Sequence, residues 1–157
     1  MIFSSRLIKL ETANQDGFTL IELLVVIGIL AILLAITLIA INPNKHFQDA
    51  RNAQRQSNVA AILDAIYEYE SSHNGNEPPS VAAVTSEEAL GGGIGQINVC
   101  PDLIPTFIAN LPMDPQAGSG TACTGTYNSG YTIASTSGRF TIAAPSAEDG
   151  ATISVTR

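Results

Sequence analysis

Residues 17–43 read GFTLIELLVVIGILAILLAITLIAINP, and this stretch determines how the rest of the chain is organised. From Phe18 to Ile41 it runs for 24 residues with one charged side chain, Glu22. A helix of that length is about 36 Å long, which is enough to cross the hydrocarbon core of a bilayer. A carboxylate inside such a segment is costly and usually functional, so Glu22 is the first candidate site residue.

A secretory signal peptide explains this run less well than a membrane-spanning helix does. Signal peptides have an apolar core of about 7–15 residues followed by a small-residue cleavage site. The run here is longer, and no such site follows it. Basic residues lie both before it, at Arg6 and Lys9, and after it, at Lys45, Arg51 and Arg55, so their distribution does not fix the orientation.

The composition of the 157-residue chain leaves room for one modest domain beside the apolar run. The formal net charge is −7 and tryptophan is absent, so we expect no direct nucleic-acid binding by the lone subunit, which would need a basic or base-stacking surface. Cys100 and Cys123 allow one disulfide if the C-terminal half is exported, which would place the C-terminus outside. Two unrelated buried thiols are the alternative.

The segment GFTLIELLVVIGILAIL, residues 17–33, closely resembles the N-terminal signature of type IV pilins and of the pseudopilins of type II secretion. The resemblance implies that residues 1–17 are a cytoplasmic leader, which a prepilin peptidase removes after Gly17. It also implies that the new terminal residue, Phe18, is N-methylated and that Glu22 is retained. Leaders of this family usually carry a basic residue before the glycine, whereas Asp16 stands here, and whether Asp16 slows cleavage stays open.

The physical reason for retaining Glu22 lies in assembly. An isolated carboxylate in lipid takes up a proton rather than stay charged. In a filament of staggered helices, the terminal ammonium of a neighbouring Phe18 can neutralise it instead, and removing one partner costs more than the pair stabilises. Glu22 is therefore expected to set the register of subunits. The alternative is a protonated glutamate that only packs against another helix.

Residues 18–42 are thus predicted to be a transmembrane and assembly helix, and residues 43–157 an exported domain. An amphipathic helix is predicted over 44–73, ended by Gly75 and the prolines after it. Its charged side chains, Arg55 among them, are expected to lie off the apolar face. That face consists of five residues at helical spacing: Val59, Ile62, Leu63, Ile66 and Tyr67.

Residues 74–125 are interpreted mainly as loops, with a short helix beginning at Ser86. The run GGGIG, residues 91–95, lacks the lysine of a phosphate loop and is interpreted as a flexible loop. Antiparallel strands are predicted over 129–156. The fold class is α+β: a long N-terminal helix, with a membrane-spanning half and an amphipathic half, packed on a small C-terminal antiparallel sheet as in pilins.

We expect no cofactor, no metal and no catalytic residue, and therefore no enzyme. LPMDPQAG, residues 111–118, resembles a stretch of major pseudopilins, some of which bind calcium. The next acid after Asp114 is Glu148, so the acidic cluster of those proteins is missing and a calcium ion near Asp114 is left open. His46 and His73 fit no metal or general-base spacing.

The function expected from the resemblance is that of a structural subunit of a type IV pilus-like filament. Its partners would be copies of itself and related minor pilins, the prepilin peptidase and methyltransferase, membrane lipid before assembly, and the assembly machinery. It would be a single-pass inner-membrane protein with an external C-terminus, and later part of a surface filament. The alternatives are a type II secretion pseudopilin and an uncleaved single-pass membrane protein with a ligand-binding external domain.

Overall fold

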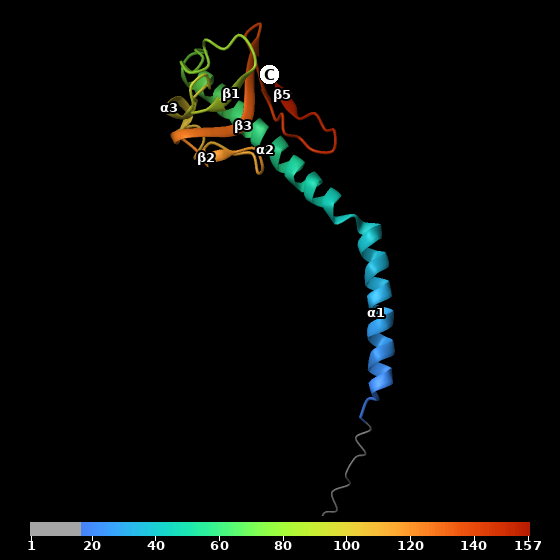
Figure 1. The fold of residues 1–157 in the computed structure, drawn as a ribbon. Coiled ribbons are helices and arrows are strands. Elements are labelled where there is room, and N and C mark those ends of the chain that lie inside the picture. The colour runs from blue at the N-terminus through green and yellow to red at the C-terminus, as the bar shows by residue number, and fades with distance from the viewer. Residues whose placement is uncertain (1–16) are drawn as a thin grey trace, which may run out of the picture. The chain divides into compact units, whose positions relative to one another are not determined.

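The computed structural model describes residues 17–157 (Figure 1). The chain divides into two compact units, one up to Asn42 and one that we call the C-terminal unit, Pro43–Arg157. Residues 1–16, which make up nearly all of the expected leader and include Asp16, lie outside the described residues.

Helix α1, Leu20–Ile41, has 22 residues and a length of about 33 Å. None of its residues is buried, and apolar side chains occupy every side of it. A helix that is apolar all round needs lipid or other helices around it. Asn42 leaves the helical conformation with a φ of 44°, and Pro43 has no amide proton to donate back into the turn before it. The membrane-length segment therefore ends at Ile41.

Helix α2, Pro43–Ser72, begins with the proline, whose fixed φ suits the first helical position. It ends within one residue of the expected 44–73. At its end the amide of Gly75 donates to the carbonyl of Glu70 at 2.8 Å, and both Asn74 and Gly75 have positive φ. This left-handed ending satisfies carbonyls that the helix leaves free, as the sequence predicted for Gly75.

Five strands form one antiparallel sheet in the order β1-β3-β4-β5, with β2 also paired to β3. The register places Ile133 opposite Ile142, and Ile142 opposite Val155. Side chains therefore alternate between a buried face and an outer face along the long strand β3. The strands are β1 Glu88–Gly91, β2 Ser119–Thr121, β3 Thr124–Thr136, β4 Arg139–Ala143 and β5 Ser154–Thr156.

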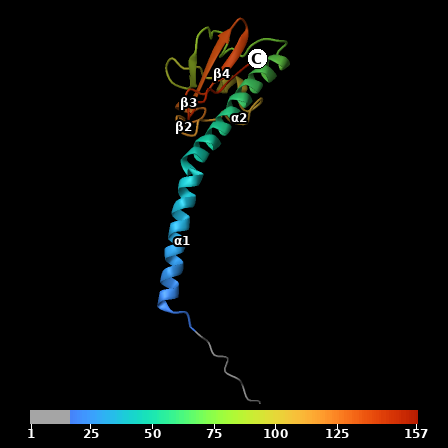
Figure 2. The same cartoon turned by 90° about the vertical axis from the view of Figure 1, so that its right-hand side faces the viewer.

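In the C-terminal unit α2 lies along one face of the sheet (Figure 2), and the buried core fills the space between them. On the sheet side, Tyr131, Phe140 and Ile142 are at most 1% exposed. On the helix side the buried residues include Val59, Ile62, Leu63 and Ile66, which is the predicted apolar face. The predicted α+β layout, helix first and then a small antiparallel sheet, is confirmed.

One local expectation between residues 74 and 125 is wrong, and a second needs refinement. The segment after Ser86 forms strand β1 instead of a helix, because Glu88 and Ala89 pair with β3. Residues 92–95 form a loop, as predicted, but its start is closely packed: the amide of Gly92 donates to the carbonyl of Tyr127 at 2.9 Å, and a Cβ on Gly92 would stand 2.7 Å from the Tyr127 ring. Tertiary contacts decided both segments.

A disulfide joins Cys100, the first residue of the short helix α3 (Cys100–Leu103), to Cys123 in the turn between β2 and β3. The two Cα atoms are 5.6 Å apart. The Tyr127 hydroxyl lies 2.8 Å from the Cys100 Sγ and donates to Asn98 Oδ1 at 2.8 Å. The disulfide therefore fixes α3 against the β2–β3 turn and the buried end of β3.

Replacing both cysteines, in Cys100→Ser/Cys123→Ser, should lower the free energy of unfolding by about 3 kcal/mol, because the disulfide closes a loop across a sequence separation of 23 residues. Urea unfolding in detergent, followed by circular dichroism, measures the change. Reducing the wild-type protein should reproduce it. An unchanged midpoint under oxidising conditions would contradict a stabilising disulfide.

Candidate assembly site

The N-terminus of α1 is closed by a reciprocal pair of contacts between Thr19 and Glu22. The Thr19 side chain accepts from the amide of Glu22 at 3.3 Å, and the Glu22 carboxylate accepts from the Thr19 amide at 2.8 Å. The Thr19 hydroxyl also donates to the same carboxylate oxygen, at 2.7 Å. This is a capping box, which satisfies amides that the first turn of a helix leaves free. Glu22 is thereby held at the start of the helix.

Gly17 and Phe18 precede the helix and have no regular secondary structure. Phe18 is 83% exposed, and no atom approaches a Cβ built on Gly17 within 4 Å. The Gly17–Phe18 bond, where the resemblance places leader cleavage, therefore lies in open, non-helical backbone of the kind that proteases reach. Cleavage there would put an amine one residue before the cap, close to the carboxylate of Glu22.

Glu22 is the single charged residue of α1. The other polar side chain of the helix, Thr37, has a partner within the helix: its hydroxyl donates to the carbonyl of Leu34 at 2.9 Å. By length and composition the helix can cross a membrane. The carboxylate of Glu22 lies at the positive end of the helix dipole, and this end stabilises a negative charge. One charge in an otherwise apolar helix is thus placed at its N-terminus.

Comparison with known families identifies this region. Residues 12–38 match the family described as the prokaryotic N-terminal methylation motif, which covers the proposed cleavage site, Phe18 and Glu22. A search of curated proteins and a search of solved structures each find no match to the chain. The chain therefore carries the prepilin motif of type IV pilins and pseudopilins, which confirms the resemblance, and the motif with the apolar helix fits an inner-membrane anchored protein.

The C-terminal unit holds a second polar cluster, built around the fully buried guanidinium of Arg55 on α2. Its five N–H donors meet five acceptors, so the buried cation is completely satisfied. Two of these bonds go to Asp114, from Nε at 2.7 Å and from Nη2 at 3.3 Å. The other three go to Glu148 at 2.8 Å, Asn52 at 3.0 Å and Gln116 at 3.1 Å.

Glu148 is held to α2 by more than Arg55. Arg51 donates to both of its carboxylate oxygens at 2.6 Å, which is a bidentate pair. Asn52 both donates to the backbone carbonyl of Glu148, at 2.9 Å, and accepts from its amide, at 3.0 Å. In the next position, Asp149 pairs with Lys45. The loop around residue 148 is thus attached along the first half of α2.

The electrostatics of the cluster follow from these contacts. Hydrogen bonds from Arg51 and then Arg55 lower the pKa of Glu148 to about 2. Burial raises the pKa of Asp114, but bonds from Arg55 and from the amides of Ala117 and Gln116 outweigh it, so the net direction is downward. The hydrogen bond to Asp114 raises the pKa of Arg55. Arg55, Asp114 and Glu148 are therefore all charged at neutral pH.

Sequence reasoning missed this cluster, because it placed Arg55 off the apolar face of the helix. Arg55 is 0% exposed and lies four residues before Val59 and seven before Ile62, which is the spacing of that same face. The helical spacing could have revealed it. The pairing with Asp114, 59 residues away, could not be read from the sequence.

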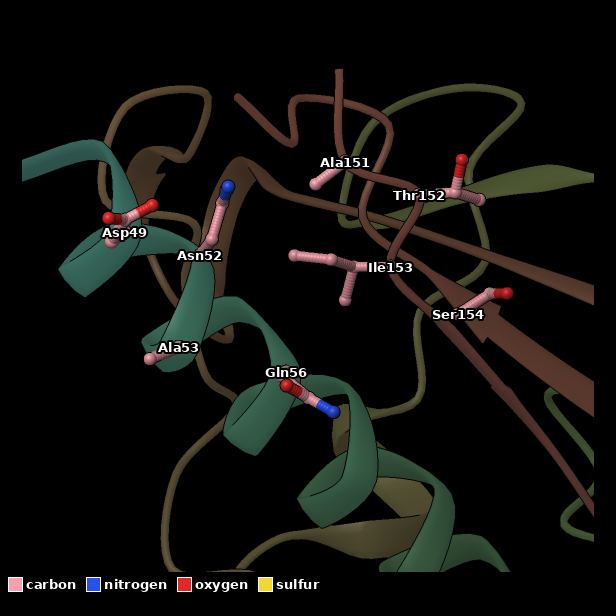
Figure 3. A pocket seen from close by; sticks show the side chains of 8 residues that line it. All are labelled: Asp49, Asn52, Ala53, Gln56, Ala151, Thr152, Ile153 and Ser154. Atoms are coloured by element: carbon pink, nitrogen blue, oxygen red, sulfur yellow. The ribbon is translucent and has the colours of Figure 1, made fainter. Parts of the chain in front are cut away.

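An open polar cleft lies between the first half of α2 and the segment leading into β5 (Figure 3). Its volume is about 400 Å³, and Ile153 points into it from the C-terminal segment. The lining is rich in amide and hydroxyl groups. It consists of Asp49, Asn52, Ala53, Gln56, Ala151, Thr152, Ile153 and Ser154. Within residues 17–157, no group of three or more His, Cys, Asp and Glu side chains is arranged to hold a metal ion.

The substitution Arg55→Leu should lower the free energy of unfolding by about 3–5 kcal/mol, because it leaves the buried carboxylate of Asp114 without its counter-charge. Arg139→Leu, on an exposed arginine, is the matched control and should change stability by less than about 0.5 kcal/mol. Adding Asp114→Asn to Arg55→Leu should recover part of the loss. Equal stability of the two arginine variants would contradict a structural role of the cluster.

Acid should also destabilise the C-terminal unit. The pKa of Glu148 is about 2 in the folded chain against an ordinary 4.5, and that of Asp114 is lowered from 3.8. The unfolded chain therefore binds more protons, and this contribution to stability, complete above about pH 5, is lost as the pH falls toward 2. Thermal unfolding between pH 7 and pH 2 tests it. Glu148→Gln should flatten the acid decline, and an identical decline in that variant would count against this origin.

Proposed function

We propose that the protein is a structural subunit of a type IV pilus-like filament, cleaved after Gly17, N-methylated on Phe18 and polymerised through α1. One observation carries the proposal: the matched motif, residues 12–38, covers most of a helix that is apolar on every side and has a capped carboxylate at its N-terminus. Such a helix is stable in lipid before assembly, and it is stable when packed against other apolar helices in the filament.

The mechanism is one of packing and register, without an enzymatic step by this chain. Helix contacts between subunits supply cohesion through close van der Waals packing. The Glu22 carboxylate, already drawn to the start of the helix by Thr19, is placed to receive the ammonium of a neighbouring Phe18. A subunit at the wrong height would leave Glu22 unpaired in apolar surroundings, which is strongly unfavourable.

The partners and location that we propose follow from this mechanism. Other copies of the chain and related minor pilins would surround α1 in the filament, and lipid would surround it before. A prepilin peptidase and methyltransferase would act at Gly17 and Phe18, and an assembly machine would move subunits from the inner membrane into a surface filament. The C-terminal unit, with its disulfide, would lie on the oxidising side of the membrane.

A secretion pseudopilin is the second candidate function. It is favoured by the stretch from Leu111 to Pro115, which resembles that of major pseudopilins. In this chain Asp114 of that stretch is occupied by Arg55 and by two backbone amides, so the turn is fixed by the chain's own groups.

The N-terminal peptide of the protein from native membranes and from the sheared surface fraction tests the proposal. Mass spectrometry should find a chain that begins at Phe18 with one added methyl group. Glu22→Ala should be processed in the same way but should yield at least tenfold less filament, because it lacks the counter-charge. Glu22→Asp is the matched control for charge.

Three results would contradict the proposal. A chain that keeps its leader would favour the uncleaved membrane protein with a ligand-binding external domain. Normal filament yield from Glu22→Ala would remove the role assigned to the carboxylate. Filaments found only when secretion genes are overexpressed would favour the pseudopilin over the pilus subunit.

A further inference from the structure

Asn74 and Gly75 form the one Asn–Gly pair in the sequence, and they follow directly on the end of α2. Asparagine before glycine is chemically labile, because the next backbone nitrogen can attack the side-chain amide and glycine has no side chain to hinder it. Both residues are exposed, and no atom lies within 4 Å of a Cβ built on Gly75. Water and base therefore reach the groups that would react.

The reaction of such a pair exchanges bonds without a change of oxidation state. The Gly75 nitrogen gives up its proton and bonds to Cγ of Asn74, and the side-chain nitrogen leaves as ammonia. Water then opens the resulting succinimide ring at either of its two carbonyls. The product is an aspartate, or an isoaspartate in which the main chain runs through the former side chain and is one carbon longer. Water is the co-reactant in both cases.

The C-terminal cap of α2 opposes this reaction in the folded chain. The Gly75 amide donates to the carbonyl of Glu70 at 2.8 Å, and Asn74 has the left-handed conformation that this type of cap requires, with a φ of 59°. Loss of the amide proton would forfeit the hydrogen bond and leave a negative nitrogen facing a carbonyl oxygen. The succinimide has no N–H at this position at all. The cap must therefore open before the ring can close.

A group of three aromatic rings, which we call the aromatic stack, holds the cap closed. The rings of Tyr69 and His73 are parallel, with centroids 3.9 Å apart. Phe107, from the turn after α3, meets Tyr69 edge-on at 5.3 Å and His73 at 6.1 Å. His73 immediately precedes Asn74, so unwinding of the cap breaks contacts of the stack. Helix ends open locally at a low free energy, and here the stack sets how often the Gly75 amide is free.

We propose that Asn74 is a site of spontaneous deamidation, which proceeds in the folded protein through opening of the α2 cap. The isoaspartate product cannot restore the cap, because its longer main chain displaces the Gly75 amide from Glu70. Either product adds a carboxylate to a segment that already contains Glu70 and Glu77, where burial and the charge of Glu77 raise the pKa of Glu70. Each conversion therefore loosens the end of α2 permanently, and the modified fraction records the age of the protein.

The rate of modification tests the site. The full-length protein is held in detergent at mildly alkaline pH, with a parallel sample in urea, and mass spectrometry of peptides measures aspartate and isoaspartate at position 74. The folded protein should be modified, but at least tenfold more slowly than the unfolded chain, because its Gly75 amide is free only when the cap opens. Asn76, which is exposed and followed by Glu77, is the internal control and should stay unmodified in both samples.

Substitutions in the aromatic stack test the role of the cap. Phe107→Ala should speed the modification of the folded chain at least threefold and leave the rate in urea unchanged. Phe47→Ala, on an exposed phenylalanine near the other end of α2, is the matched control and should change neither rate. His73→Ala removes an exposed ring of the stack, so it provides the same measurement if Phe107→Ala does not fold.

The proposal fails in any of three cases. Equal rates in the folded and the urea samples would show that the cap does not control the reaction. Unmodified Asn74 in every folded sample would show that the folded protein has no such site. Wild-type rates in both Phe107→Ala and His73→Ala would remove the gating assigned to the stack. All of these measurements are made on the isolated subunit, so the proposed filament role stands or falls separately.

Discussion

A helix with apolar side chains on every side has no stable position in water, and this constraint governs the unit that contains α1. Over its 22 residues α1 buries nothing against its own chain. Its surface must be covered by lipid or by other protein, so the unit up to Asn42 is incomplete as a monomer. A charged side chain is tolerated in such a helix only where hydrogen-bond donors are nearby. The amide and the hydroxyl of Thr19 supply two such donors to the carboxylate of Glu22.

The C-terminal unit is governed by a different constraint, which is the burial of the Arg55 guanidinium. A guanidinium that is shielded from water must find a partner for each donor, and Arg55 does so with groups from three separate parts of the chain. A core of Val, Ile and Leu is not directional and would tolerate some sliding of helix on sheet. The five hydrogen bonds of Arg55 have fixed directions, and they therefore select one position for α2 relative to the loops at 114 and 148.

The sequence was sufficient for the features that depend on local order. The apolar run, the helix end at Gly75 and the strands after residue 129 follow from composition, periodicity and turn residues. It failed where distant partners decide: the segment after Ser86 became a strand because β3 offered an edge, and Gly91 and Gly92 pack closely against Tyr127. For the candidate site, the motif indicated Gly17, Phe18 and Glu22, and the spacing of Thr19 and Glu22 before the apolar run is the sequence signature of a capping box, which the sequence reasoning overlooked.

The attachment of Glu148 to α2 also has a consequence for synthesis. Arg51 and Arg55 are made early, but the carboxylate that they share is 97 and 93 residues further along the chain. A chain synthesised only as far as Asp114 can satisfy part of the guanidinium of Arg55, and its remaining donors stay unpaired until Glu148 follows. The docking of α2 therefore depends on a segment more than ninety residues further along the chain.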